Sequence, residues 1–253
     1  MAQPSPVPVR FPSGLSTDFP YGPLANMGQP NPFMYHIEAD DFDMLATTYT
    51  ATKTTAGTIA SVAGDGGLLL FTTNATTPLV TDIASLQNPV ANFANIAGKK
   101  MHFLTRLQTS DVVNSAILAG LIQTTTTPFT VTDGIYFSKP TGSSTNLVLI
   151  SMIASVATTL VIPTSAYTLT NGTNVDLGFF VDRSGNIMAF VGSLLVGWIA
   201  QSGTGTPGPT RGPCASFAPT ITTAVLAPTL AIQSGSATSK TMTVDFMLAS
   251  RER

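Results

Sequence analysis

Short runs of apolar residues, many of them alternating with polar residues at a period of two, follow one another along most of the chain. In the segment 241–248, Met242, Val244, Phe246 and Leu248 form one apolar row with mostly polar residues between them. A period of two places successive side chains on opposite faces of a strand. The pattern therefore predicts β-strands at residues 67–71, 100–108, 135–138, 147–153, 159–162, 175–182, 187–191 and 241–248.

Turn-forming residues such as Asp133-Gly134 separate these runs. The clearest local unit is 175–192, where two apolar strands flank a polar turn in which Gly185 is expected to take a positive φ angle. Many short strands with such turns indicate an antiparallel sandwich or barrel. We therefore predict an all-β fold.

Two segments depart from this pattern. A short helix or helical turn is predicted at 82–93, because Leu86 and Val90 lie four residues apart, and Pro89 limits its length. The segment 146–162 is the most apolar stretch, but it is short for a membrane span and is interrupted by serine and threonine. We interpret it as two buried strands.

The first 36 residues contain eight prolines, a density that blocks helices and central strands and favours extended backbone. We predict an extended Pro-rich arm at 1–36 and a β-sandwich domain at 37–253. Apolar residues between the prolines indicate that the arm lies on a surface, either of its own domain or of a neighbouring subunit, and a disordered leader is the alternative. The residues predicted to make these contacts are Val7, Val9, Phe11, Phe19, Tyr21, Phe33 and Tyr35.

The composition narrows the possible functions. Only 9% of the 253 residues are charged, the net charge is -2, and the hydrophobic fraction is 43%. So few cations give no electrostatic footprint for nucleic acid, and so apolar a chain is not a disordered tail. Because charged residues are depleted at the cores of protein interfaces, the composition favours a subunit that packs against copies of itself or against partners.

Residues suited to catalysis or metal binding are few. Cys214, the single cysteine, lacks the surroundings of a reactive thiol, and His102 is predicted to be a surface or edge histidine on a strand. His36 is expected to pair with a nearby carboxylate. An acidic cluster lacks the spacing of a calcium loop and is interpreted as a solvated junction between arm and domain; it comprises Glu38, Asp40, Asp41 and Asp43. We therefore predict no catalytic residues, no cofactor site and no metal site.

Three segments, Gly120–Met152, Val175–Gly192 and Met242–Arg253, resemble structural proteins of tailed bacteriophages. In those proteins a strand pair, a glycine-containing hairpin and a closing strand build a jelly-roll sandwich similar to concanavalin A and laminin G domains. The resemblance covers about residues 95–253. The residues that match are Gly120, Asp133, Gly134, Ile135, Phe137, Asp176, Gly178, Gly185, Asp245 and Phe246.

The resemblance implies an antiparallel jelly-roll sandwich in a virion protein, and more specifically a head decoration, or cement, protein on the capsid surface. Such a protein is commonly a trimer, and it stabilises the capsid without enzymatic activity by bridging capsid subunits. Its partners would be the major capsid protein and copies of itself, with no nucleic acid, membrane or cofactor. The arm residues named above would then contact the capsid or a neighbouring subunit.

Three alternatives stay open. The first is a carbohydrate- or receptor-binding module on a phage tail or fibre, with Trp198, Tyr136 or Tyr167 as stacking groups. The second is a glycosidase on the same fold, which would need a pair of buried carboxylates with shifted pKa values in a cleft. The third is a minor capsid or scaffolding role.

Overall fold

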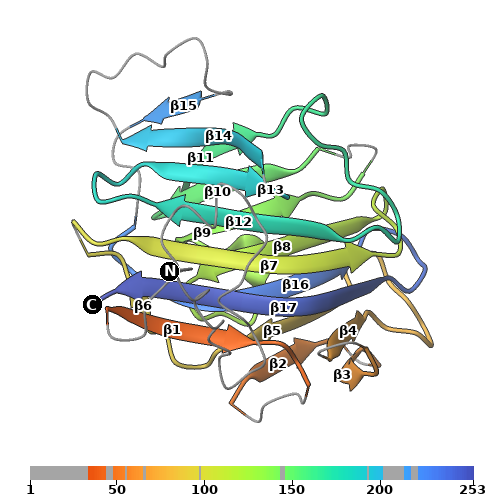
Figure 1. Cartoon of the computed structure of the whole chain (residues 1–253). Helices are drawn as coiled ribbons and strands as arrows, with labels where there is room; N and C mark the ends of the chain where they lie inside the picture. Colours follow the sequence, from red (N-terminus) through yellow and green to blue (C-terminus); the bar gives the residue numbers. More distant parts are fainter. Residues whose placement is uncertain are drawn as a thin grey trace, which may run out of the picture.

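The computed structural model of the chain describes residues 34–43, 48–54, 56–64, 67–96, 98–142, 146–192, 194–201, 214–217 and 222–253. These residues form two stacked β-sheets, of nine and eight strands, and one short 3-10 helix at Pro128–Thr130 (Figure 1). Paired strands are antiparallel except β14 and β15, which are parallel. The predicted all-β sandwich is therefore confirmed.

The strands of the nine-stranded sheet are, in spatial order, β15 (Cys214–Phe217), β14 (Leu194–Gln201), β13 (Ile187–Val191), β12 (Val175–Val181), β7 (Met101–Thr109), β17 (Thr241–Glu252), β4 (Leu68–Thr72) and β3 (Thr58–Val62), with β1 (Tyr35–Asp40) also paired to β17. The strands of the eight-stranded sheet are β11 (Val156–Val161), β10 (Val148–Ile153), β9 (Gly134–Lys139), β8 (Ser115–Ile122), β16 (Val225–Ser234), β5 (Ile83–Gln87) and β2 (Thr50–Lys53), with β6 (Phe93–Ala94) also paired to β16.

The strands predicted from alternation are present. Each of the eight predicted ranges overlaps one strand, namely β4, β7, β9, β10, β11, β12, β13 and β17. The hairpin at 175–192 pairs β12 with β13, and Gly185 in its turn has a φ angle of 82°. The apolar segment 146–162 forms two strands, β10 and β11, as predicted, but β11 is mostly exposed rather than buried. Among the described residues, no helix has the length and hydrophobicity of a membrane span.

The helical turn predicted at 82–93 is wrong. Residues Ile83–Gln87 form β5, which pairs with β16 on one side and β2 on the other. Tertiary pairing therefore overrides the four-residue spacing that suggested a helix. Pro89 lies just beyond the end of β5, where its missing N–H interrupts no ladder.

The core lies between the two sheets. Phe103 of β7 stacks on Phe179 of β12 with their ring centroids 5.5 Å apart, and Phe137 of β9 approaches Phe179 from the other sheet at 6.4 Å. All three side chains are fully buried. Alternate residues of β7 and β12 therefore point into the sandwich, and the residues between them point away from it.

A β-bulge in β17 changes which of its side chains enter the core. Val244 is paired with Leu107 and Phe246 with the adjacent Arg106, so Asp245 is the extra residue. Met242 and Val244 belong to the core before the bulge, and Met247 and Ala249 belong to it afterwards. Phe246 and Leu248 form a separate cluster with Leu104. The prediction that Met242, Val244, Phe246 and Leu248 share one face is therefore wrong.

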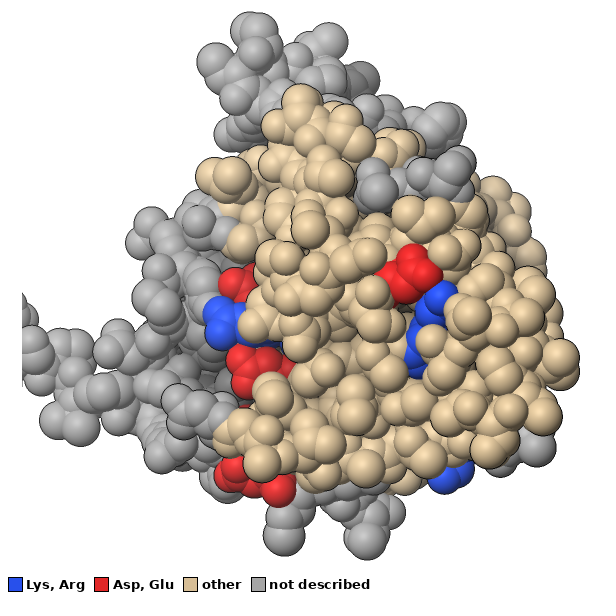
Figure 2. All heavy atoms as spheres, turned by 90° about the vertical axis from the view of Figure 1, so that its right-hand side faces the viewer, with Lys and Arg blue, Asp and Glu red and all other residues tan. Residues whose placement is uncertain are grey.

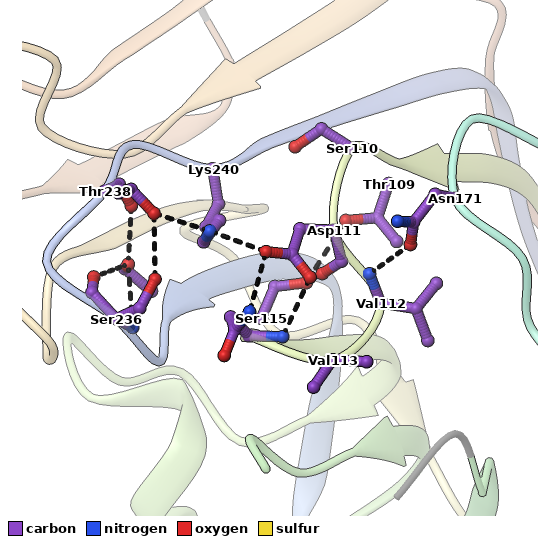
Figure 3. Close-up of polar contacts among 12 residues, drawn as sticks. Thr109, Ser110, Asp111, Val112, Val113, Ser115, Asn171, Ser236, Thr238 and Lys240 are labelled. Carbon is purple, nitrogen blue, oxygen red and sulfur yellow. Dashed lines mark hydrogen bonds and ion pairs between the residues drawn. The ribbon is translucent and has the colours of Figure 1, made fainter. Parts of the chain in front are cut away.

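Polar side chains close one end of the sandwich, where three loops meet (Figure 3). The Lys240 ammonium donates to the Asp111 carboxylate at 2.7 Å, and Asp111 also accepts hydrogen bonds from Asn114. Asn171, from the loop that precedes β12, accepts a hydrogen bond from the Val112 N–H at 2.7 Å. These contacts tie the β7–β8 loop to the loops that precede β12 and β17.

Lys139 of β9 is fully buried near the same end and donates to the carbonyl oxygens of Val113 and Ser115. Burial lowers its pKa to about 8, and the nearby Asp111 carboxylate opposes that shift. Burial alone would raise the pKa of Asp111, but hydrogen bonds from Lys240 and Asn114 outweigh it and hold the pKa well below its ordinary value. Asp111 therefore supplies the negative charge that compensates the buried ammonium groups of Lys240 and Lys139.

We expect the substitution Asp111→Ala to lower the free energy of unfolding by about 2 kcal/mol, because it leaves the buried Lys240 without its anion. The cost is below that of breaking a fully buried pair, since the Asp111 side chain is 23% exposed. Urea denaturation measures it, and Lys53→Ala, at an exposed lysine of β2, is the control expected to change little.

The pH dependence gives a second check on this pair. A carboxylate with a lowered pKa stabilises the fold above its ordinary pKa, and that contribution is lost as the pH falls below it. The difference in the free energy of unfolding between the unsubstituted protein and Asp111→Ala should therefore become smaller as the pH falls from about 5 to about 3. A deficit that is unchanged over this range would contradict the assigned role.

Candidate functional site

The outer face, defined as the side of the nine-stranded sheet that points away from the eight-stranded sheet, carries apolar side chains at its centre. Leu104 of β7 lies beside Leu248 of β17, and Phe246 completes their cluster. Phe180 of β12 lies one register step away, beside His102 of β7. These side chains are 4–8% exposed, so the centre of the outer face is buried although it points away from the second sheet, and its apolar composition is that of a covered face.

His102 lies at the centre of the outer face, and its predicted place on the surface or at an edge is wrong. It belongs to β7, a central strand, and is 8% exposed. Its ring packs between Tyr35 and Phe180, with centroids 5.6 Å and 4.7 Å away. Burial, with a further contribution from Lys100, lowers the pKa of His102 to about 4, so the imidazole is neutral at physiological pH.

An ion group borders the apolar part of the outer face. Arg106 Nε lies 2.6 Å from Asp176 Oδ1, and Arg106 Nη1 lies 3.3 Å from Asp245 Oδ2. The guanidinium also lies 5.8 Å from the centroid of the Phe246 ring. Arg106 thus joins the β12 hairpin to the bulge in β17. The alternation in the sequence did not reveal this group, because its members come from three strands.

The open edge, defined as the side of β11 that no described strand pairs with, is the second unusual surface and lies in the upper part of Figure 1, near β14 and β15 of the other sheet. Among the described residues, β11 is the end strand of the eight-stranded sheet. Its sequence, VATTLV, has no charge, and the side chains of Val156 and Val161 are 70% and 50% exposed. Leu194 of β14 is 62% exposed. Soluble proteins usually protect such edges with charged residues or proline.

Figure 2 shows how sparse the charges are on the end of the sandwich that it displays. Red and blue spheres occur in a few separate groups, and the described residues drawn between them, in tan, are uncharged. The low charge of the sequence is therefore visible on the folded surface.

Glu38 and Asp40 of β1 form a polar group with Tyr49. Glu38 and Asp40 are two residues apart on the side of β1 that faces the other sheet, and both carboxylates interact with the Tyr49 hydroxyl. Burial raises the pKa of each carboxyl, and it also raises the pKa of Tyr49. The group is thus a pair of carboxyls with raised pKa values, held by a shared tyrosine.

Within the acidic cluster, Asp43 is exposed as the predicted solvated junction requires, but the other three members are not. Glu38 and Asp40 are half-buried, and Asp41 is 8% exposed. The predicted pairing of His36 with a carboxylate is also wrong, because His36 packs against Phe93 and its Nε2 atom has no hydrogen-bond partner. Within the described ranges, no set of three or more histidine, cysteine or acidic residues is placed to hold a metal ion.

Most of the predicted contact residues lie outside the described residues: Val7, Val9, Phe11, Phe19, Tyr21 and Phe33. Tyr35, the last residue of that set, is described; it begins β1 and contacts His102. The side chain of Cys214 also lies outside the description.

The three aromatic residues considered as a stacking platform are not brought together. Trp198 of β14 is paired with Met188 on the nine-stranded sheet. Tyr136 packs in a cluster on the eight-stranded sheet, and Tyr167 packs against the core. Of the three, Trp198 alone lies on the outer face.

No protein-family model and no curated protein sequence matches this chain. Solved structures do match its fold. An endo-1,3-beta-glucanase from Streptomyces sioyaensis has 13% sequence identity and a TM-score of 0.54, over 89% of this chain and 99% of that one. The carbohydrate recognition domain of Emp47p has 8% identity and a TM-score of 0.52, over 88% and 99% of the two chains.

The chain has the concanavalin A-like jelly-roll fold. A protein of unknown function from Shewanella oneidensis MR-1 is similar to the same extent, with 13% identity and a TM-score of 0.53 over 87% of each chain. The fold predicted from the sequence is confirmed by these structures. At such low identity the likeness establishes the fold alone, because one fold supports many functions.

The two glutamates of the chain should respond to pH in opposite ways. Burial raises the pKa of Glu38, so its ionisation opposes folding, and the loss of stability appears as the pH rises through its raised pKa. A hydrogen bond from Arg183 lowers the pKa of Glu252 to about 2, so its charge stabilises the fold above its ordinary pKa.

We therefore expect Glu38→Gln to raise the melting temperature at about pH 7 and to change it little at about pH 4. Glu252→Gln is the matched control and should lower the melting temperature at about pH 7, with a smaller effect as the pH falls below its ordinary pKa of about 4.5. Thermal denaturation monitored by circular dichroism tests both. Equal shifts in the same direction at neutral pH would refute this assignment.

Proposed function

We propose that this protein is a non-enzymatic structural component of a tailed-bacteriophage virion that decorates the capsid and stabilises it by bridging capsid subunits. Its partners would be the major capsid protein and copies of itself, in a homo-oligomer for which a trimer is favoured. The proposal combines the phage-like sequence segments with surfaces suited to protein contact. The N-terminal residues named from the sequence remain the predicted capsid contacts.

The observation that carries the proposal is the uncharged open edge. On the side of β11 away from β10, no strand of the described ranges pairs with its backbone, and the side chains of Val156 and Val161 are exposed. Such an edge is a liability for a free monomer, because it is a template for pairing with another chain. For a subunit of an assembly, the same edge provides backbone hydrogen bonds and apolar contact without the cost of desolvating charges.

The proposed bridging would stabilise the capsid through the number of its contacts. A contact that contributes little free energy by itself contributes much in total when it is repeated between neighbouring capsomers over a whole closed shell. Each decoration subunit would add burial of apolar surface that opposes separation of the capsomers it joins. This role needs no catalytic group, and it suits a rigid sandwich.

The fold likeness supports one alternative, a carbohydrate- or receptor-binding module on a phage tail or fibre. The matched structures include a carbohydrate recognition domain and a glucanase, and Trp198 is half-buried on the outer face. A glycan that stacks on Trp198 would fit this reading. Glycan-array binding that is lost in Trp198→Ala would favour it over decoration.

Immunogold electron microscopy of the virus particles, with serum raised against this chain, separates the two roles. Gold over the head is the expected result. Gold on the tail would favour the receptor-binding module, and absence from all particles would refute both virion roles.

Positive charge at the open edge should weaken assembly. We expect Val156→Lys combined with Val161→Lys to shift the oligomer toward monomer in sedimentation velocity and to reduce co-sedimentation with capsids at least tenfold, because two cations would oppose strand addition. The control is Val113→Lys, at a side chain that is 40% exposed in the β7–β8 loop. Assembly and capsid binding equal to those of the control would refute the role of this edge.

A further inference from the structure

We propose that the cationic end of the nine-stranded sheet binds an acidic segment of a partner protein that also carries apolar side chains. The cationic end is defined by the residues Lys99, Lys100, Arg183, Arg251 and Arg253. The inference names the chemistry of a partner, and it holds or fails independently of the proposed role in a virion.

Three neighbouring strands bring these residues together. The two lysines directly precede β7, and Arg183 lies in the turn between β12 and β13. Arg251 and Arg253 lie at the end of β17. Met101, the first residue of β7, is paired with Val181 of β12 on one side and with Arg251 on the other. The five cations therefore gather at the left-hand end of this sheet in Figure 1, where the label C stands.

The cationic end carries more positive than negative charge. Its five cations are nearly half of the 11 lysine and arginine residues of the chain, whose net charge is -2. The side-chain carboxylates on the same strand ends are Asp182 and Glu252, so three positive charges are left in excess. Asp182 accepts hydrogen bonds from the backbone of its own turn, and Glu252 is bound by Arg183. The fold thus concentrates positive charge that is sparse in the sequence.

The other four cations form no ion pair with a side-chain carboxylate of the described residues. Lys99, Arg251 and Arg253 each donate to a backbone carbonyl. Lys100 Nζ lies 5.9 Å from the centroid of the Phe180 ring. Because a lysine has three N–H donors and an arginine has five, these contacts use only part of the donors. The remaining donors can bind an anionic group of a partner.

Two histidines beside the cationic end respond to its positive potential. Burial lowers the pKa of His36, and Arg251 and Arg253 lower it further. Burial also lowers the pKa of His102, and Lys100 contributes in the same direction. Cations that were neutralised by bound carboxylates would have little such effect, so both shifts support an excess of positive charge.

Exposed apolar side chains border the cationic end. Met34 is 56% exposed, and its carbonyl accepts a hydrogen bond from the Arg253 N–H at 2.8 Å. Ile96 is 45% exposed, and its carbonyl accepts a hydrogen bond from the Lys99 N–H at 3.0 Å. A guanidinium binds a carboxylate with two parallel hydrogen bonds, and apolar side chains of the same partner would cover the border.

A protein partner fits this surface better than a nucleic acid does. Binding of nucleic acid at physiological salt depends on many phosphate contacts, each of which needs a cation. Five cations with two carboxylates among them provide few such contacts. Met34 and Ile96 would also bury little apolar surface against a phosphate backbone, whereas apolar side chains of a protein would cover them.

Fluorescence anisotropy of labelled probes, titrated with the full-length protein, tests the proposal. The first probe is a peptide with six glutamates and two leucines. The second has glutamine in place of glutamate, the third has serine in place of leucine, and the fourth is an oligothymidylate with six phosphates. We expect the first peptide to bind most tightly and the glutamine peptide not to bind. Its affinity should fall as salt is added, because salt screens exposed charges.

Substitutions and cross-linking locate the site. Lys99→Glu and Lys100→Glu should each weaken binding of the first peptide by about fivefold or more, because each replaces attraction with repulsion. The matched control, Lys53→Glu, reverses one charge at an exposed lysine of β2 and should change the affinity by less than about twofold. A variant that does not fold is replaced by its glutamine counterpart. Carbodiimide cross-linking, read by mass spectrometry, should join the peptide to Lys99 or Lys100 and not to Lys53.

Equal affinity for the glutamate and glutamine peptides would overturn the proposal, and so would cross-links at Lys53 alone. Binding of the oligothymidylate as tightly as the first peptide would overturn it as well, because the partner would then be a nucleic acid. Equal affinity for the leucine and serine peptides would contradict the contribution of Met34 and Ile96 and therefore the partner that we propose.

Discussion

The bulge at Asp245 fixes what each side of the nine-stranded sheet presents. β17 pairs with β7 along one side and with β4 and β1 along the other, so it lies at the centre of the sheet. Because the side-chain period of a strand is two, one extra residue exchanges inward and outward positions for everything beyond it. Met247 and Ala249 therefore enter the core, and Phe246 and Leu248 point outward. The apolar outer face depends on this exchange.

Contacts on both sides of the sheet hold the bulge in place. On the inner side, the fully buried Thr105 hydroxyl donates to the Phe246 carbonyl at 2.7 Å. On the outer side, Arg106 pairs with Asp245 and with Asp176 of β12. The extra residue is therefore a charged one that faces an arginine at the border of the apolar surface. Bulges of this kind re-aim side chains and are features of a fold rather than defects in it.

The sequence was sufficient for the fold class and for strands with one buried face. It was insufficient where a strand is buried on both sides, as in β8, whose eight residues are all buried and show no alternation. The bulge was also hidden, because Asp245 occupies a polar position in an alternating row whether or not the register shifts. His102 looked like a surface residue, since only the pairing of β7 with β12 and β17 brings Tyr35 and Phe180 around it.

The use of charge connects the fold to the proposed role. Several of the few charged residues are engaged within the domain: Arg106 with Asp176 and Asp245, Lys240 with Asp111, and Arg183 with Glu252. Lys139 is buried against backbone carbonyls. Charged side chains that are paired within the domain contribute little to repulsion between molecules in solution. The strand β11 has no charged residue. A monomer with such a surface would associate readily, whereas a subunit of a permanent shell meets partners on the surfaces that lack charge. The distribution of charge therefore fits the proposed role of an assembly subunit.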